Sequence, residues 1–145
     1  MSKSCTQFVL NPCGSCRVHA AKRGSCKIKI EGARCIIDCD RCQVFLGGGR
    51  PDFVVLRAIN GQVMEYIIIE IKATINSAGH VLRQIEAALK VLERQLSGPG
   101  LRCAAVVVRE RRIRSQVADA LTSSRLKCFG RRVPVVVKEC GAWIR

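Results

Sequence analysis

Apolar residues follow two different spacings along the chain from residue 51 onward. Short runs rich in Val and Ile, such as 66–69 and 103–108, have the length and composition of buried strands. A segment after residue 80 instead places its apolar residues three and four apart, the spacing of one helix face. The expected strands are 51–58, 63–73, 102–108 and 133–137, and the expected helices are 79–96 and 113–124. This order predicts an α/β domain in which helices cover a sheet whose later strands are parallel.

The chain divides near three consecutive glycines at 47–49. Seven of its ten cysteines lie before this point, at positions 5, 13, 16, 26, 35, 39 and 42. We therefore expect a small Cys-rich leader with a β-hairpin over 1–46, followed by the α/β domain over 47–145.

Two Cys-x-x-Cys pairs frame the leader. They are Cys13 with Cys16 and Cys39 with Cys42. Between them, 27–30 and 35–37 are expected to form a short hairpin, and two such pairs joined by a hairpin resemble a zinc ribbon. Four thiolates suit a tetrahedral structural Zn²⁺ site.

Disulfides are the alternative explanation for these cysteines. Cys26 and Cys35 lie on the two strands of the expected hairpin, where a disulfide can bridge them. The remaining cysteines, Cys5, Cys103, Cys128 and Cys140, are available for other pairs or as small core residues.

Composition also indicates the setting in which the protein works. No apolar run is long enough to span a membrane, and the first residues lack the pattern of a signal peptide, so we expect an intracellular, cytoplasmic protein. Asn and Gln total only nine, and 17 Arg outnumber 8 Lys, which leans toward a thermophilic source. Intracellular disulfides persist in some hyperthermophiles.

The charge of the chain points to a polyanionic partner. The formal net charge is +14, from 25 basic and 11 acidic residues, and such an excess favours nucleic acid over a merely solvated surface. Four Phe, one Tyr and one Trp are few for stacking the bases of a single strand. We therefore expect contacts with phosphate backbones, as in double-stranded or branched DNA.

Two acids and a lysine lie at the ends of neighbouring predicted strands. Pro51-Asp52 opens the first strand, and Glu70-Ile71-Lys72 ends the second. The two carboxylates and the carbonyl oxygen of Ile71 form a hard-oxygen site for Mg²⁺ or Mn²⁺. Such a metal polarises a phosphate and helps to produce hydroxide, while Lys72 can orient that water or neutralise developing charge. The alternative is a salt bridge at a strand end beside a simple turn.

The metal site requires one particular strand register. A two-residue turn at Asn60-Gly61 would pair Ile59 with Gln62 and turn Glu70 away from Asp52. A three-residue loop over 60–62 pairs Ile59 with Val63 and sets Asp52 opposite Glu70. We predict this odd-length loop, or a bulge with the same effect, which also places Phe53 opposite Ile69 and Val55 opposite Ile67.

Pro51-Asp52, the hairpin and Glu70-Ile71-Lys72 together resemble the PD-(D/E)xK nuclease superfamily over about 43–138. The superfamily includes type II restriction enzymes, archaeal Holliday junction resolvases and RecB-like exonucleases. The resemblance implies a restriction-endonuclease-like mixed sheet flanked by helices, and a Mg²⁺-dependent deoxyribonuclease in which Asp52, Glu70 and Lys72 are catalytic. Small resolvase-like members act as homodimers on branched DNA, so both properties are expected here.

Other family features match only in part. Members carry a polar residue on the helix after the lysine, and Gln84 fits this role, although the Tyr found in RecB-like members is missing. His80 lies one turn earlier and is expected to begin the helix. The additional Glu of a first helix has no clear counterpart, since only Glu31 precedes the motif. Iron–sulfur clusters of some RecB-like members need a different distribution of cysteines.

Two non-enzymatic functions remain open from the sequence. The chain can be a nucleic-acid-binding protein that retains the nuclease fold without catalysis. It can also be a zinc-ribbon regulator in which the α/β domain serves for assembly.

Overall fold

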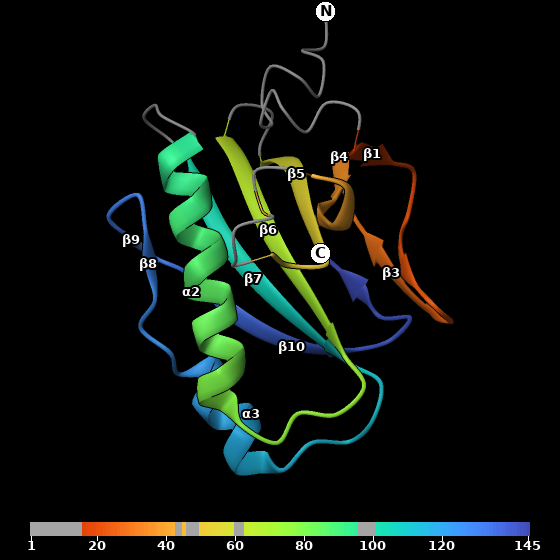
Figure 1. Ribbon diagram of the computed structural model, residues 1–145, viewed down its shortest axis with the longest axis vertical. Coiled ribbons are helices and arrows are strands. Elements are labelled where there is room, and N and C mark those ends of the chain that lie inside the picture. Colours follow the sequence, from red (N-terminus) through yellow and green to blue (C-terminus); the bar gives the residue numbers. More distant parts are fainter. Residues whose placement is uncertain (1–15, 43–44, 46–49, 60–62, 96–100) are drawn as a thin grey trace, which may run out of the picture.

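The main feature of the computed structural model is a six-stranded mixed sheet (Figure 1). The structure describes residues 16–42, 45, 50–59, 63–95 and 101–145. The strands, in sheet order, are β1 (Arg17–Val18), β4 (Ala33–Asp38), β5 (Phe53–Ile59), β6 (Val63–Lys72), β7 (Arg102–Arg109) and β10 (Val135–Glu139). The pairs from β1 to β6 are antiparallel, whereas β6–β7 and β7–β10 are parallel. The prediction of an α/β class with parallel later strands is confirmed.

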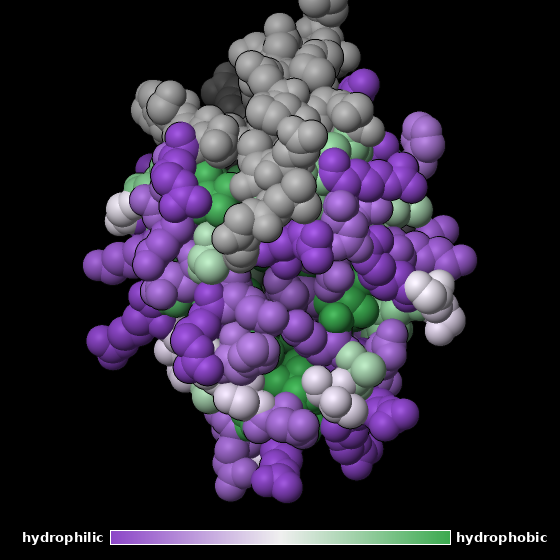
Figure 2. Space-filling view, in the orientation of Figure 1, coloured by the Kyte–Doolittle hydropathy of each residue, from purple (hydrophilic) through white to green (hydrophobic). Residues whose placement is uncertain are grey.

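Two helices cover one face of this sheet (Figure 1). They are α2 (Ala78–Gln95) and α3 (Ser115–Thr122), close to the predicted bounds. The buried residues of α2 include Val81, Ile85, Ala88 and Leu92, so its apolar stripe faces the sheet as the spacing predicts. Figure 2 shows that the outer surface on this side is mainly hydrophilic. No helix in the described part of the chain is both long and apolar enough to cross a membrane.

A smaller sheet packs against the other face. It joins β2 (Ala21–Arg23), β3 (Cys26–Ile30) and β11 (Trp143–Ile144) in the order β11-β3-β2. Ile28 and Ile144 from this sheet pack with Phe53, Val55 and Ile67 of the large sheet, which forms a second apolar core. The remaining described elements are the 3₁₀ turn η2 (Cys39–Arg41) and a two-stranded hairpin of β8 (Lys127–Cys128) and β9 (Arg131–Arg132).

The register of β5 and β6 is the one that the predicted metal site requires. Ile59 pairs with Val63, and Phe53 pairs with Ile69. Residues 60–62 themselves lie outside the described part of the chain, but the pairing on either side of them confirms the predicted register. The described pairing ends at Phe53 and Ile69, and its continuation by one residue would set Asp52 opposite Glu70.

The leader is organised differently from the expected hairpin. β3 pairs with β2 and β11, whereas β4 pairs with β1 and β5, so 27–30 and 35–37 belong to different sheets and the predicted hairpin is wrong. The turn between them passes through Gly32 at φ +74, a conformation that glycine adopts without strain. Each strand then buries its apolar side in a different core, which explains the separation. β4 and β5 are paired neighbours although the expected domain boundary at residue 46 lies between them.

Candidate active site

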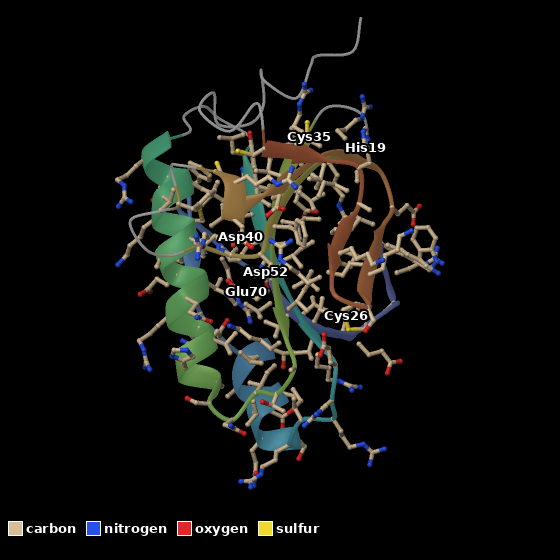
Figure 3. The ribbon with its side chains drawn as sticks, turned by 45° about the vertical axis from the view of Figure 1, so that its right-hand side comes forward. His19, Cys26, Cys35, Asp40, Asp52 and Glu70 are labelled. Atoms are coloured by element: carbon tan, nitrogen blue, oxygen red, sulfur yellow. A yellow bond between two sulfur atoms is a disulfide. The ribbon has the colours of Figure 1, made fainter. Side chains whose placement is uncertain are left out.

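Asp52 lies at the start of β5, directly against the backbone at the end of β6. Its N–H donates to the carbonyl oxygen of Ile69 at 3.1 Å, and its Oδ2 accepts a hydrogen bond from the N–H of Ile71 at 2.6 Å. Ile69 is also the partner of Phe53, so these bonds hold Asp52 one residue out of the β5–β6 register, with its carboxylate against the end of β6. Asp52 lies close enough to Glu70 for its charge to contribute to the raised pKa of Glu70. Figure 3 shows Asp40, Asp52 and Glu70 in succession beside the sheet. The structure therefore brings the two predicted acids together.

Glu70 is a buried carboxylate with an incomplete set of partners. The residue is 3% exposed, and its Oε1 has no hydrogen-bond partner among the described residues. Its Oε2 lies 3.7 Å from Nζ of Lys72. Burial raises the pKa of Glu70 to about 7, and the proximity of Lys72 opposes this rise. A buried oxygen without a partner is costly, so a cation beside Oε1 would stabilise the charged form.

The donor atoms at this position fit a hard divalent cation. Burial also raises the pKa of Asp52, while the hydrogen bond from Ile71 and the charge of Arg23 oppose the rise. The carboxylates of Asp52 and Glu70 and the carbonyl of Ile71 are all oxygen ligands, the type that Mg²⁺ and Mn²⁺ prefer. The free Oε1 of Glu70 leaves one such ligand available.

Sequence reasoning missed Asp38 and Asp40, which complete a group of four acids with Asp52 and Glu70. We call these four residues the acidic cluster; they make up four of the eleven acids in a strongly basic chain. Asp38 ends β4 and caps η2 by accepting a hydrogen bond from the N–H of Asp40 at 3.1 Å. The spacing of Cys39 and Cys42 indicates a zinc ligand pair, and no local pattern around Asp38 and Asp40 predicts that they lie near Asp52.

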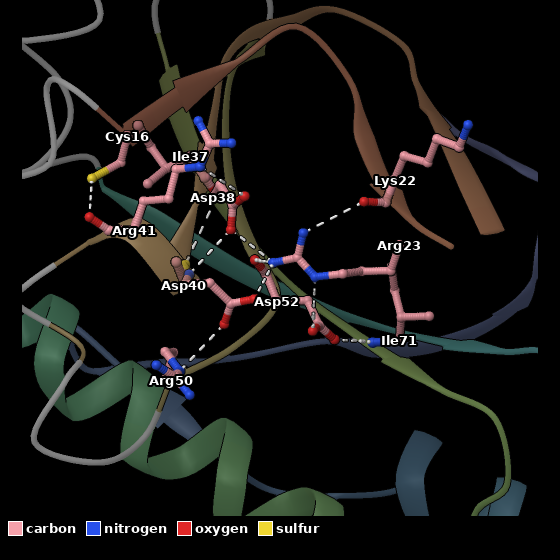
Figure 4. Close-up of polar contacts among 11 residues, drawn as sticks. Cys16, Lys22, Arg23, Ile37, Asp38, Asp40, Arg41, Arg50, Asp52 and Ile71 are labelled. Carbon is pink, nitrogen blue, oxygen red and sulfur yellow. Dashed lines mark hydrogen bonds and ion pairs between the residues drawn. The ribbon is translucent and has the colours of Figure 1, made fainter. Parts of the chain in front are cut away.

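Arg23 of β2 inserts its guanidinium among these acids (Figure 4). Its Nη2 lies 2.7 Å from Oδ1 of Asp38 and 3.0 Å from Oδ2 of Asp40, and its Nε lies 3.6 Å from Oδ1 of Asp52. The guanidinium also lies over the ring of Phe53, 4.3 Å from its centroid. Arg23 therefore forms ion pairs with Asp38, Asp40 and Asp52 of the acidic cluster. The fourth acid, Glu70, pairs with Lys72 instead.

Replacing Arg23 by Gln should weaken the fold and strengthen metal binding. Asp38 is nearly buried, so loss of its closest cation should lower the free energy of unfolding by about 1–3 kcal/mol. The same loss makes the acidic cluster more negative, so Mg²⁺ should stabilise the variant more than it stabilises the wild type. Urea unfolding with and without Mg²⁺ measures both effects. Arg23→Lys, which keeps the charge, is the control, and equal Mg²⁺ effects in Arg23→Gln and wild type would refute this role.

The remaining predicted site residues lie on α2. The Oε1 of Gln84 is buried without a hydrogen-bond partner among the described residues. No described contact joins Gln84 to the acidic cluster or to Lys72, so its catalytic role stays a prediction. His80 is exposed at the start of the helix, as expected, and it lines a cavity of about 310 Å³ together with Lys72 and Asn76.

The cysteines of the leader favour the disulfide explanation where the structure describes them. Cys42 is disulfide-bonded, so it is not a free thiolate for the predicted zinc site, and Cys35 is disulfide-bonded as well. Cys16 and Cys39 are free and buried. Burial, with the charge of Asp38, raises the pKa of the Cys39 thiol, which disfavours a thiolate there. Cys13 lies outside the described residues.

Cys26 forms its disulfide with a different partner from the one expected. It is bonded to Cys140 rather than to Cys35, because β3 and β4 lie in different sheets. Cys26, Cys140 and Glu110 place one ligand atom each within 4.8 Å of one another, so this group can hold a metal ion. Its two sulfurs become thiolate ligands only when the disulfide is reduced.

No protein-family model, curated protein or solved structure matches the chain. A proposal of function therefore depends on the geometry of the site and on the motif formed by Pro51-Asp52 and Glu70-Ile71-Lys72.

Proposed function

We propose that the protein is a metal-dependent endonuclease that hydrolyses phosphodiester bonds in DNA. The observation that carries this proposal is the buried Glu70 beside Asp52 and Lys72, whose Oε1 has no hydrogen-bond partner in the described part of the chain. A carboxylate placed in this way needs a cation, and the neighbouring ligands are those of Mg²⁺. Perturbed acids of this kind concentrate at functional sites.

The arrangement of elements supports a nuclease of the PD-(D/E)xK type. Three antiparallel strands, β4, β5 and β6, are followed by α2 and then by β7, which is parallel to β6. This is the order expected for a restriction-endonuclease-like sheet, and it places the acids at adjoining strand ends. The motif supplies the residue types, and the hydrogen bond from Ile71 keeps the Asp52 carboxylate near Glu70.

The protein's own residues would hold the catalytic carboxylates and Lys72 in position. Mg²⁺, when bound, would polarise the scissile phosphate and promote formation of hydroxide. The N–H of Ile71 fixes the Asp52 carboxylate, and Lys72 holds Glu70 through its ammonium group. The backbone of Lys72 is itself held, since its carbonyl oxygen accepts a hydrogen bond from the N–H of Glu110 at 3.0 Å. Lys72 Nζ can then donate to the attacking water or to a phosphate oxygen.

Two adjoining cavities offer a path for a phosphate backbone. The first, of about 310 Å³, is lined by Lys72, and the second, of about 390 Å³, is lined by Arg112 and Arg114. Both are lined by Thr74, Ile75 and Asn76, so they meet at the loop after β6. Cations in the second cavity would bind phosphates next to the scissile bond, which agrees with the net charge of +14.

Incubation of the wild-type protein with supercoiled plasmid and with branched DNA tests the proposal. We expect cleavage with Mg²⁺ or Mn²⁺ and none with excess EDTA. The protein should be kept without reductant, so that the Cys26–Cys140 disulfide stays intact. Binding of both substrates without cleavage under all metal conditions would instead indicate a non-catalytic nucleic-acid-binding protein.

A further inference from the structure

A hollow of about 270 Å³ lies on the face of the large sheet opposite the helices. Apolar residues from three strands line it, among them Ile67, Val106 and Val136, and Trp143 of β11 lies beside them. Trp143 and Val136 are the exposed large hydrophobic residues of the described chain, with exposed fractions of 49% and 40%. Trp143 is the single tryptophan of the chain. Because it is exposed, packing in a core does not explain the presence of this large aromatic side chain.

Cations surround the indole ring. Nζ of Lys29 and Cζ of Arg145 each lie 5.8 Å from its centroid. Arg57, Lys138 and Arg145 line the hollow. The two arginines have acidic partners, since Arg57 pairs with Glu65 at 2.7 Å and Arg145 pairs with Glu31 at 3.5 Å.

The two lysines differ from the arginines in this respect. Lys29 and Lys138 form no ion pair with any residue that the structure describes. Their charges are therefore available to an anion that approaches Trp143. A half-exposed aromatic ring close to cations without acidic partners is a combination that proteins use to bind single-stranded nucleic acid.

Charge decides between the two occupants that an apolar hollow can have. A second copy of this chain would bring the same cations against these cations, in a protein of net charge +14. A nucleic-acid strand brings a flat base for the indole and phosphates for the lysines. We propose that the Trp143 hollow binds single-stranded nucleic acid, with one base stacked on Trp143 and phosphates against Lys29 and Lys138.

This site is separate from the acidic cluster. Ile67 and Glu70 are three residues apart on β6, so their side chains point to opposite faces of the sheet. The proposal goes beyond the nuclease proposal and needs no metal. The small number of aromatic residues argued against the stacking of single-stranded bases. The proposal changes that expectation, because the single Trp lies where a base can stack. A branched or locally unwound DNA would present such a strand.

Fluorescence of Trp143 tests the proposal directly, because no other tryptophan contributes to the signal. Wild-type protein is titrated with an oligothymidylate of about ten nucleotides, a length within the site sizes of single-strand binders. EDTA is present throughout, so that cleavage does not occur and the result is independent of the nuclease proposal. We expect quenching by the oligonucleotide and no quenching by inorganic polyphosphate, which has the charge but not the bases.

Variants separate stacking from charge. Trp143→Ala should weaken binding of a labelled oligothymidylate by about 5-fold to 100-fold, whereas Trp143→Phe should retain most of the affinity. Lys138→Gln should keep the quenching but make the slope of log K against log salt less negative by about 0.7. Lys127→Gln, which removes an exposed lysine of β8 on the helix side, should leave quenching and slope unchanged. Circular dichroism checks that each variant is folded.

Three results would overturn the proposal. The oligonucleotide could bind without any change in Trp143 fluorescence, or polyphosphate could quench as strongly as the oligonucleotide. Fluorescence that changes with protein concentration in the absence of nucleic acid would show that a second copy covers the hollow.

Discussion

Asp52→Asn is expected to lower the rate of plasmid cleavage by about 1,000-fold or more. The amide has the shape of the carboxylate and can still accept the hydrogen bond from the N–H of Ile71, so the fold around it should persist. It lacks the negative charge that holds a divalent cation, and a bound metal contributes several kcal/mol of transition-state stabilisation. The rate of nicking under saturating Mg²⁺ measures the effect.

A matched variant controls for loss of any aspartate. Asp119 is exposed on α3, and Asp119→Asn should cleave at the wild-type rate. Lys72→Ala should resemble Asp52→Asn in its loss of activity, since Lys72 both supports Glu70 and faces the cavity. Cleavage at the wild-type rate by Asp52→Asn would remove this carboxylate from the mechanism.

Glu70→Gln is expected to stabilise the metal-free protein above pH 7. The pKa of Glu70 is about 7 in the folded protein, against an ordinary value of 4.5, so the folded state binds this proton more tightly than the unfolded state. The free energy of unfolding of the wild type should therefore fall as the pH rises from about 4.5 to 7, by on the order of 2 to 3 kcal/mol. Gln does not ionise, so the variant should lack this loss.

Urea unfolding at pH 5 and pH 8, in EDTA and without reductant, measures this difference. The wild type should lose stability between the two pH values relative to Glu70→Gln. Mg²⁺ at about 100 times its dissociation constant should restore about 2.7 kcal/mol to the wild type but not to Glu70→Gln. Glu86→Gln, an exposed glutamate of α2, is the control and should follow the wild type. Equal pH dependence in wild type and Glu70→Gln would show that burial does not raise the pKa of Glu70.

The register of the hairpin of β5 and β6 was accessible from sequence because two constraints favour the same pairing. The apolar residues of β5 and β6 must face the cores, and the predicted metal site needs Asp52 opposite Glu70. Both constraints predict that Phe53 pairs with Ile69, and this pairing is present. The same logic identified α2, whose buried residues recur at helical spacing. Local periodicity therefore predicted the parts of the fold in which neighbouring segments pack together.

Contacts between segments distant in the sequence were not accessible in this way. Arg23 reaches Asp38 and Asp52 only because β2 and β3 fold across the large sheet, and no local pattern encodes that crossing. The partner of Cys26 is 114 residues away, at Cys140. Cys-x-x-Cys spacing indicated zinc, whereas Cys42 is disulfide-bonded in the folded chain. Pairing of cysteines depends on tertiary topology, which the spacing does not determine.

Calorimetric titration with Mn²⁺ tests most directly whether Asp52 and Glu70 form a metal site. Performed without reductant, it keeps Cys26 and Cys140 oxidised, so that their sulfurs offer no competing thiolates. We expect one binding event for the wild type and for Glu86→Gln, weaker at pH 6 than at pH 8 because Glu70 must lose its proton, and no such event in Asp52→Asn or Glu70→Gln. A wild type that binds no Mn²⁺, or Asp52→Asn and Glu70→Gln variants that bind it as tightly as the wild type, would show that these two acids do not form a metal site.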